Sequence, residues 1–133
     1  MITPTIHFQG NCGEAIDFYR EVFGADVKEI NYAKDAPINS GMEDFPSDFV
    51  MHSEVVICGM SFSLTDGAEA QISGKNFSFL IRYQTTEELV AIFEKLAKDG
   101  KIVEALAPQF WTPLWGYVID KFGVNWSLMV QDQ

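Results

Sequence analysis

Two stretches of the chain repeat apolar side chains at the three- and four-residue spacing that is typical of amphipathic helices. The apolar positions are Ala15, Phe18, Tyr19 and Val22 in the first stretch and Leu89, Ile92, Phe93 and Leu96 in the second. Asn11 and Glu14 resemble a capping box before the first helix, and Gly24 is placed to end it. Thr85 is the corresponding start of the second helix, and Gly100 is its predicted end. Both helices are expected to lie with one face against a sheet.

Alternation of polar and apolar residues in the rest of the chain predicts strands. The predicted strands cover residues 4–9, 27–32, 50–57, 61–65, 76–84, 101–105, 116–119 and 125–130. Cys58-Gly59 is the predicted turn between two of them. Residues 33–48 contain two prolines, one glycine and four acidic residues, with little periodicity. They are expected to form a long loop, and loops of that length are often functional.

Taken in order, these elements read β-α-β-β-β twice, which predicts an internal duplication. The helical positions of the two stretches match at a constant offset, and an aromatic-Ser-Leu triplet closes each half at residues 62–64 and 126–128. We therefore expect one domain over residues 1–133, with a first module of about residues 1–67 and a second of about 68–133. The break between them is predicted near residues 67 to 75.

Composition and charge narrow the classes of function. A chain of 133 residues that is 47% hydrophobic is the size of one domain with one core. A net charge of −10 argues against binding to nucleic acids or anionic membranes. No apolar run is long enough to cross a bilayer, and the first residues lack a signal-peptide pattern, so the protein is expected to be cytoplasmic. Cys12 and Cys58 are far apart in the sequence and are expected to be reduced. Cys12 is expected to be a small buried residue, and a reactive thiol in the first turn of the helix is the alternative.

Residues 110–126 contain all three tryptophans of the chain, interrupted by proline and glycine. This pattern predicts a loop that enters a hairpin, with rings that line a core or a pocket. Trp111 and Trp115 are therefore candidate walls of an apolar ligand site, and packing in the core or at a dimer interface is the alternative. Trp126 alternates with Leu128 on the last strand and is expected in the core.

Several stretches together resemble the vicinal oxygen chelate superfamily, which includes glyoxalase I, bleomycin-resistance proteins and extradiol dioxygenases. The residues that carry the resemblance are 8–19 (FQGNCGEAIDFY), 50–53 (VMHS), 110–111 (FW) and 120–126 (DKFGVNW). The chain looks most like the PhnB-like branch, often labelled demethylubiquinone methyltransferase-like. The resemblance implies an α+β fold in which two βαβββ modules form an incomplete barrel around a cavity. It also implies a homodimer.

The methyltransferase label is not carried over to this chain. No glycine-rich loop lies between a strand and a helix to bind a methyl donor, and two βαβββ units lack a doubly wound sheet. Catalytic members of the superfamily hold a divalent metal with histidine and glutamate. The corresponding positions are Ser63 and Ser127 on the closing strands, and Pro4 or Thr5 and Asn76 or Ser78 on the opening strands. These residues are poor ligands for zinc or nickel, so no cofactor is expected.

Strand periodicity indicates which polar side chains face a cavity or solvent instead. His52 and Glu54 share the face of their strand opposite to Ser53 and Val55, and His7 lies on the corresponding face of the first strand. A His52–Glu54 pair would suit a general acid or base, and with His7 it would suit a displaced metal site. The alternative is a solvated polar face.

On the last strand, Asn125 and Ser127 point away from Trp126 toward the cavity, and together with Ser63 they are candidate ligand-binding residues. Arg82 points to the face of its strand opposite to that of its apolar neighbours. It is either a surface residue or a contact for an anionic ligand.

Two classes of function follow. In the first, the protein binds a small organic molecule, with Trp111 and Trp115 as walls and His52 and Glu54 as polar contacts. In the second, it is a lyase, isomerase or dioxygenase-type enzyme that uses His52 and Glu54 with or without a divalent metal. A third possibility is a vestigial pocket and a role for the dimer surface. Because the expected metal ligands are missing, small-molecule binding is the favoured prediction.

Overall fold

The structure is a computed structural model, and it describes residues 1–67 and 74–131. The chain divides into two compact units, residues 1–72 and residues 73–133. The predicted break near residues 67 to 75 falls mainly on residues 68–73, outside the described residues. Each unit has its own sheet and its own helix.

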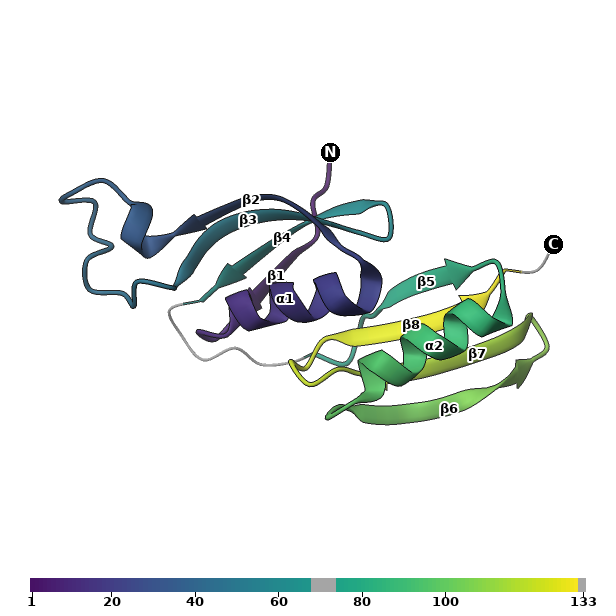
Figure 1. Ribbon diagram of the computed structural model, residues 1–133. Coiled ribbons are helices and arrows are strands. Elements are labelled where there is room, and N and C mark those ends of the chain that lie inside the picture. Colours follow the sequence, from purple (N-terminus) through teal and green to yellow (C-terminus); the bar gives the residue numbers. More distant parts are fainter. Residues whose placement is uncertain (68–73, 132–133) are drawn as a thin grey trace. The chain divides into compact units, whose positions relative to one another are not determined.

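The first unit is a four-stranded mixed sheet with one helix (Figure 1). Its elements are β1 (Thr5–Phe8), α1 (Cys12–Phe23), β2 (Asp26–Tyr32), the 3-10 helix η1 (Ala33–Asp35), β3 (Val50–Ile57) and β4 (Met60–Asp66). The strand order is β1-β4-β3-β2, in which β1 is parallel to β4 and the other neighbours are antiparallel. The long loop predicted after β2 is present, apart from the short η1 at its start.

The second unit repeats this topology. Its elements are β5 (Phe79–Tyr83), α2 (Thr86–Ala97), β6 (Lys101–Gln109), β7 (Thr112–Ile119) and β8 (Asn125–Val130). The strand order is β5-β8-β7-β6, again with the first pair parallel and the others antiparallel. The common strand order confirms the two predicted βαβββ modules of an α+β protein.

Each helix covers one face of its own sheet with the predicted apolar stripe. In the first unit the buried side chains include Ala15, Phe18, Tyr19, Val22, Val55, Ile57, Phe62 and Leu64. In the second unit they include Leu89, Phe93, Leu96, Ile81, Val118, Trp126 and Leu128. Burial of such side chains contributes roughly 1.5–3 kcal/mol each, so these stripes are the main source of stability in each unit.

The helix ends agree only in part with the sequence patterns. Thr85 Oγ1 accepts the N–H of Glu88 at 3.2 Å, and Gly24 adopts a left-handed conformation with φ of 65°, both as predicted. The side chain of Asn11 makes no capping bond to α1, so that prediction is wrong. At the end of α2 the left-handed residue is Asp99, with φ of 60°, and the helix itself stops at Ala97 before reaching Gly100.

The strands β6 and β7 are longer than predicted and are joined by the two-residue turn Phe110-Trp111. Pro113 and Trp115 therefore lie in β7, although a loop was predicted there. Pro113 is exposed, and proline is tolerated in a strand where its nitrogen is not needed for the hydrogen-bond ladder. In the described part of the chain, neither helix has the length and apolar character of a bilayer-spanning segment.

Candidate functional site

One face of the first sheet is not covered by α1, and we call it helix-free face 1. On β3, Ser53, Val55 and Ile57 are buried under the helix, whereas His52 and Glu54 are exposed on the opposite face, as their alternation predicted. The same face carries polar residues from all four strands: Thr5, His7, Glu29, Asn31, His52, Glu54, Ser61, Ser63 and Thr65.

Both histidines of the chain lie on this face. His7 stands opposite Thr65 in the parallel pairing of β1 and β4, and its Nδ1 is 2.8 Å from the Thr65 hydroxyl oxygen. Ser53, the neighbour of His52 on β3, exchanges two hydrogen bonds with Leu64, the neighbour of Thr65 on β4. His7 on β1 and His52 on β3 therefore lie on either side of Thr65 on β4, although the two histidines are far apart in the sequence.

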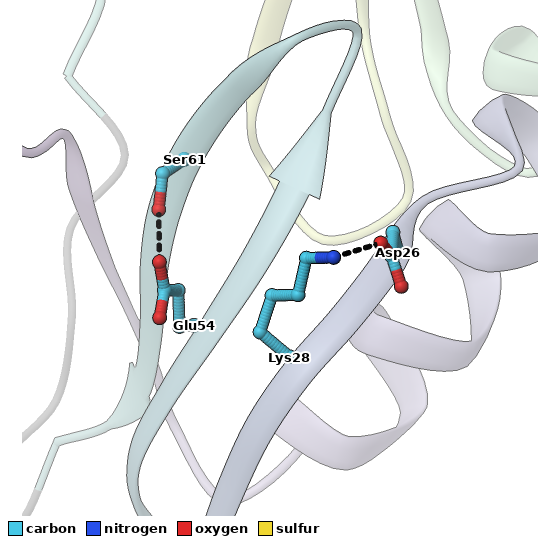
Figure 2. A network of polar contacts seen from close by, with 4 residues as sticks. All are labelled: Asp26, Lys28, Glu54 and Ser61. Atoms are coloured by element: carbon cyan, nitrogen blue, oxygen red, sulfur yellow. Dashed lines mark hydrogen bonds and ion pairs between the residues drawn. The ribbon is translucent and has the colours of Figure 1, made fainter.

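Glu54 belongs to a polar network at the other end of this face. The Ser61 hydroxyl donates to Glu54 Oε1 at 3.0 Å, and Lys28 forms an ion pair of 2.5 Å with Asp26 (Figure 2). The hydrogen bond that the Lys28 ammonium donates to Asp26 raises the pKa of Lys28, and the negative charges of Asp26 and Glu54 act in the same direction. Glu29 stands directly opposite Glu54 on β2. Glu54 thus has Ser61 as its hydrogen-bond partner and Glu29 opposite it on β2, and it is close enough to Lys28 to influence its charge.

The predicted His52–Glu54 pair is not hydrogen-bonded in this structure. Glu54 uses Oε1 to accept from Ser61, and His52 makes no hydrogen bond or ion pair within residues 1–67 and 74–131. The two side chains share a face two residues apart, a separation of roughly 7 Å between their Cα atoms. Glu54 therefore does not orient the imidazole of His52 in the way that a general base requires.

The second sheet also has one face free of its helix, which we call helix-free face 2. A Cβ atom on Gly116 would lie 2.9 Å from Phe93 of α2, so Gly116 faces the helix. Its neighbours Trp115 and Tyr117 consequently point to the opposite face. The strand register then places two rows across this face: Arg82, Met129, Trp115 and Ala107 in one, and Leu80, Ser127, Tyr117 and Glu104 in the other.

Three aromatic rings form a cluster where β6 turns into β7. Phe110 and Trp111 are in edge contact with centroids 5.0 Å apart, and Trp111 and Trp115 are in edge contact at 6.0 Å. Phe110 is 98% exposed and Trp111 is 45% exposed, while Trp115 is half-buried. We call these three residues the aromatic platform. Trp126 lies in the core as predicted, and its Nε1–H donates to Asp120 Oδ2 at 2.8 Å.

Asn125 and Ser127 lie on the same side of β8 as Met129, but they are buried. The Asn125 amide Nδ2 donates to the carbonyl oxygens of Gly74 and Phe77, and so holds the segment before β5 against β8. Asn125 Oδ1 is buried without a hydrogen-bond partner within residues 1–67 and 74–131. The geometry thus gives Asn125 a structural contact. The predicted ligand roles of Asn125, Ser127 and the half-buried Ser63 remain predictions.

A hollow of about 310 Å³ lies in the loop between β2 and β3, and its lining residues are not among the predicted site residues. Its lining includes Lys34, Ile38, Met42 and Phe45. The carboxylate of Glu43 holds the loop by accepting the N–H groups of Asn39 at 2.6 Å and Gly41 at 3.1 Å. Backbone N–H groups, first that of Glu43 itself and then that of Asn39, lower the pKa of the Glu43 carboxyl.

Cys12 is fully buried in the first turn of α1. Burial raises the pKa of its thiol far above the ordinary value of 9.0, and the negative charge of Asp66 raises it further. This thiol is therefore protonated at neutral pH and unsuited to be a nucleophile. The prediction that Cys12 is a buried structural residue is confirmed.

Within residues 1–67 and 74–131, the donor atoms available for a divalent metal do not form a site. Ser63 and Ser127, at the positions predicted to correspond to metal ligands of the superfamily, offer only hydroxyl groups. No group of three or more His, Cys, Asp or Glu side chains within residues 1–67 and 74–131 is arranged to hold a metal ion. The displaced site of His7, His52 and Glu54 is therefore not formed among these residues.

Comparison with known proteins identifies relatives along nearly the whole chain. The profile of a family described as 3-demethylubiquinone-9 3-methyltransferase matches residues 1–129. Protein YjdN of Escherichia coli (strain K12) is 34% identical over 142 residues, which cover 99% of this chain and 96% of YjdN.

Solved structures of similar proteins agree with this match. The PhnB protein from Bacillus cereus has 26% identity and a TM-score of 0.84, covering 98% of both chains. Protein PA1353 from Pseudomonas aeruginosa has 26% identity and a TM-score of 0.85, covering 100% of this chain and 98% of its own. The fosfomycin resistance protein FosX from Listeria monocytogenes, solved with Mn(II) and 1S,2S-dihydroxypropylphosphonic acid, has 13% identity and a TM-score of 0.70, covering 99% and 92%. FosX shares the fold alone, and these neighbours confirm the predicted glyoxalase/bleomycin-resistance fold.

Proposed function

The chain belongs to the family described as 3-demethylubiquinone-9 3-methyltransferase, and on that premise we propose that it binds a small organic molecule on helix-free face 2. We propose binding in place of methyl transfer because each unit is a four-stranded mixed sheet with one helix. Nucleotide-like donors are usually held by a doubly wound parallel sheet with a glycine-rich turn. The family name therefore says to which proteins this chain is related, and we do not propose methyl transfer as its function.

The exposed aromatic platform is the observation that carries this proposal. Trp111 and Trp115 are in edge contact at 6.0 Å, on the side of β7 that α2 does not cover. A pair of indole rings that faces away from the core offers a large apolar surface at little conformational cost. Ligand sites are typically lined by such rings together with a few polar groups, and Ser127 and Tyr117 lie in the neighbouring row.

The test uses the indole N–H signals of the three tryptophans, observed by NMR while single- and double-ring compounds are added. The platform predicts that a bound compound shifts the signals of Trp111 and Trp115. The signal of Trp126 serves as an internal reference, since its Nε1–H is buried and bonded to Asp120. Trp111→Ala should weaken any such binding by about tenfold or more, which is the size expected for loss of one stacked ring.

Phe77→Ala is the matched control, because Phe77 is a ring of the same unit that is 59% exposed but lies outside the platform. It should leave the affinity unchanged. If no compound shifts Trp111 or Trp115 at millimolar concentration, or if Trp111→Ala and Phe77→Ala behave alike, helix-free face 2 is not the ligand site.

A second candidate function is acid–base catalysis on helix-free face 1, as a lyase, isomerase or dioxygenase-type enzyme. It is favoured by the position of both histidines beside Thr65 and by the 2.8 Å contact between His7 Nδ1 and the Thr65 hydroxyl. In that case His52 is the proposed proton carrier and Glu54 a neighbouring negative charge. His52→Ala should abolish turnover of a glyoxalase- or dioxygenase-type substrate with the fold intact, and Trp111→Ala should not.

Calorimetric titration of metal-stripped protein with zinc, nickel and manganese separates the metal-dependent form of this candidate from the metal-free form. Saturable binding near one ion per chain, lost in His52→Ala or Glu54→Ala, would support a metal enzyme. Binding that is unchanged in both variants would remove His52 and Glu54 as ligands. The metal-free form is favoured because Ser63 and Ser127 offer only hydroxyl groups and because the described residues include no cluster of three metal-binding side chains.

A further inference from the structure

Arg82 lies in the same row of helix-free face 2 as Trp115. In the parallel pairing of β5 and β8, Arg82 stands opposite Met129. In the antiparallel pairing of β8 and β7, Met129 stands opposite Trp115. Directly opposed residues of neighbouring strands point to the same face, so the three side chains cross the sheet in one line, and Trp111 contacts its far end.

Arg82 is an exposed cation without a counter-ion in the described structure. The chain has 19 acidic and nine basic residues, yet Arg82 forms no ion pair and no hydrogen bond within residues 1–67 and 74–131. The other arginine, Arg20, lies 3.9 Å from Asp17 on α1. In a chain with this excess of carboxylates, an unpaired guanidinium next to an apolar surface is a free binding group for an anion.

The spacing of this row sets the size and direction of a ligand. Arg82 and Trp115 are two strand spacings apart, roughly 10 Å between their backbones. Met129, half-buried, provides an apolar surface between them. Glu104 lies on the same face at the β6 side, where its negative charge disfavours an anion. An anionic group is therefore best placed toward β5, with its apolar part over Met129 and toward the aromatic platform.

We propose that the ligand of helix-free face 2 is an organic anion with a planar or apolar body of one or two rings. Its charged group pairs with Arg82, and its apolar body contacts Met129 and the rings of Trp115 and Trp111. This inference rests on the proposed function and adds to it the chemical class of the ligand.

The experiment compares two probes of almost equal shape, 2-naphthoate and the neutral 2-naphthamide. Each is titrated into the intact chain and followed by the indole signals of Trp111 and Trp115. The wild-type protein should bind 2-naphthoate about three- to tenfold more tightly, the range expected for one solvent-accessible, charge-assisted contact. Added salt should reduce this preference, because exposed charges are screened.

Arg82→Gln should remove the preference for 2-naphthoate and leave the affinity for 2-naphthamide unchanged. Arg20→Gln makes the same change in net charge on α1 of the first unit, at a residue that is not part of the row, and should retain the preference. Arg82→Lys should retain only part of it, since an ammonium group cannot make two parallel hydrogen bonds to a carboxylate.

The possible failures are distinguishable. Equal affinity of the wild-type protein for both probes, with Trp111→Ala weakening both, would overturn the anion inference and leave the proposed function intact. A preference for 2-naphthoate that persists in Arg82→Gln would overturn the assignment of Arg82. Absence of saturable binding by both probes would overturn the proposed function and this inference together.

Discussion

The carboxylate of Asp66 caps the helix that begins at Cys12, although 54 residues separate them. Asp66 Oδ1 accepts the N–H of Cys12 at 3.0 Å and that of Gly10 at 2.9 Å, while Oδ2 accepts the N–H of Val50 at 2.9 Å. One buried side chain at the end of β4 therefore satisfies donors at the start of α1 and at the start of β3. This role replaces the local cap that the sequence pattern predicted for Asn11.

Asp66→Asn should destabilise the first unit by about 1–3 kcal/mol. One oxygen of the amide can still accept from Cys12 and Gly10, but the NH₂ group that replaces Oδ2 cannot accept from Val50, so two donors face each other in a buried place. Chemical denaturation measures the change. Asp48→Asn removes the same charge at an exposed position and should alter stability little; equal effects of the two changes would contradict the capping role.

Gly116→Ala should destabilise the second unit by about 1–3 kcal/mol, since a Cβ atom there would overlap two side chains. The added carbon would lie 2.7 Å from Leu106 Cδ2 and 2.9 Å from Phe93 Cε2. Gly13→Ala on α1 meets nothing within 4 Å and is the matched control, expected to be neutral or stabilising by up to about 1 kcal/mol. Thermal unfolding of the two variants tests this, and an unchanged Gly116→Ala protein would show that Gly116 does not face α2.

The two cysteine thiols should differ sharply in reactivity. Cys58 is exposed in the turn between β3 and β4, whereas Cys12 is buried and its thiol has a raised pKa. Native protein at mildly alkaline pH should therefore react rapidly with Ellman's reagent at one thiol per chain, and at two after unfolding. Cys58→Ser should remove the rapid reaction and Cys12→Ser should keep it. A rapid reaction in Cys58→Ser would show that Cys12 is accessible.

The loop between β2 and β3 should show a pH-dependent contact at Glu43. Because backbone N–H groups lower the pKa of this carboxyl, its stabilising contact is present above the ordinary value of 4.5 and is lost as pH falls through the lowered value. The amide signals of Asn39 and Gly41, followed by NMR, should titrate with a midpoint below 4.5. Glu43→Gln should abolish this titration, and a midpoint at or above 4.5 would show that the contact does not favour the charged form.

Local periodicity was sufficient to predict most of the fold. The apolar stripes of residues 15–22 and 89–96 became α1 and α2, and β3 and β8 have the predicted ends. Strand patterns repeat every two residues and helix patterns every three or four, so each is visible within one short window of sequence. The alternation on β3 likewise placed His52 and Glu54 on the face away from α1. The duplicated β-α-β-β-β order, and with it the two modules, followed from these local elements.

What the sequence determined by itself was therefore the type and order of the elements and the face on which each strand residue lies. The tertiary structure alone decided which strands are neighbours and in what register, because pairing depends on contacts between residues distant in the chain. It brought Arg82, Met129 and Trp115 into one row, and it placed Asp66 at the start of α1 in the position expected for Asn11. It also extended β7 through Trp115, since pairing with β6 and β8 outweighed the turn preference of the local Pro and Gly residues.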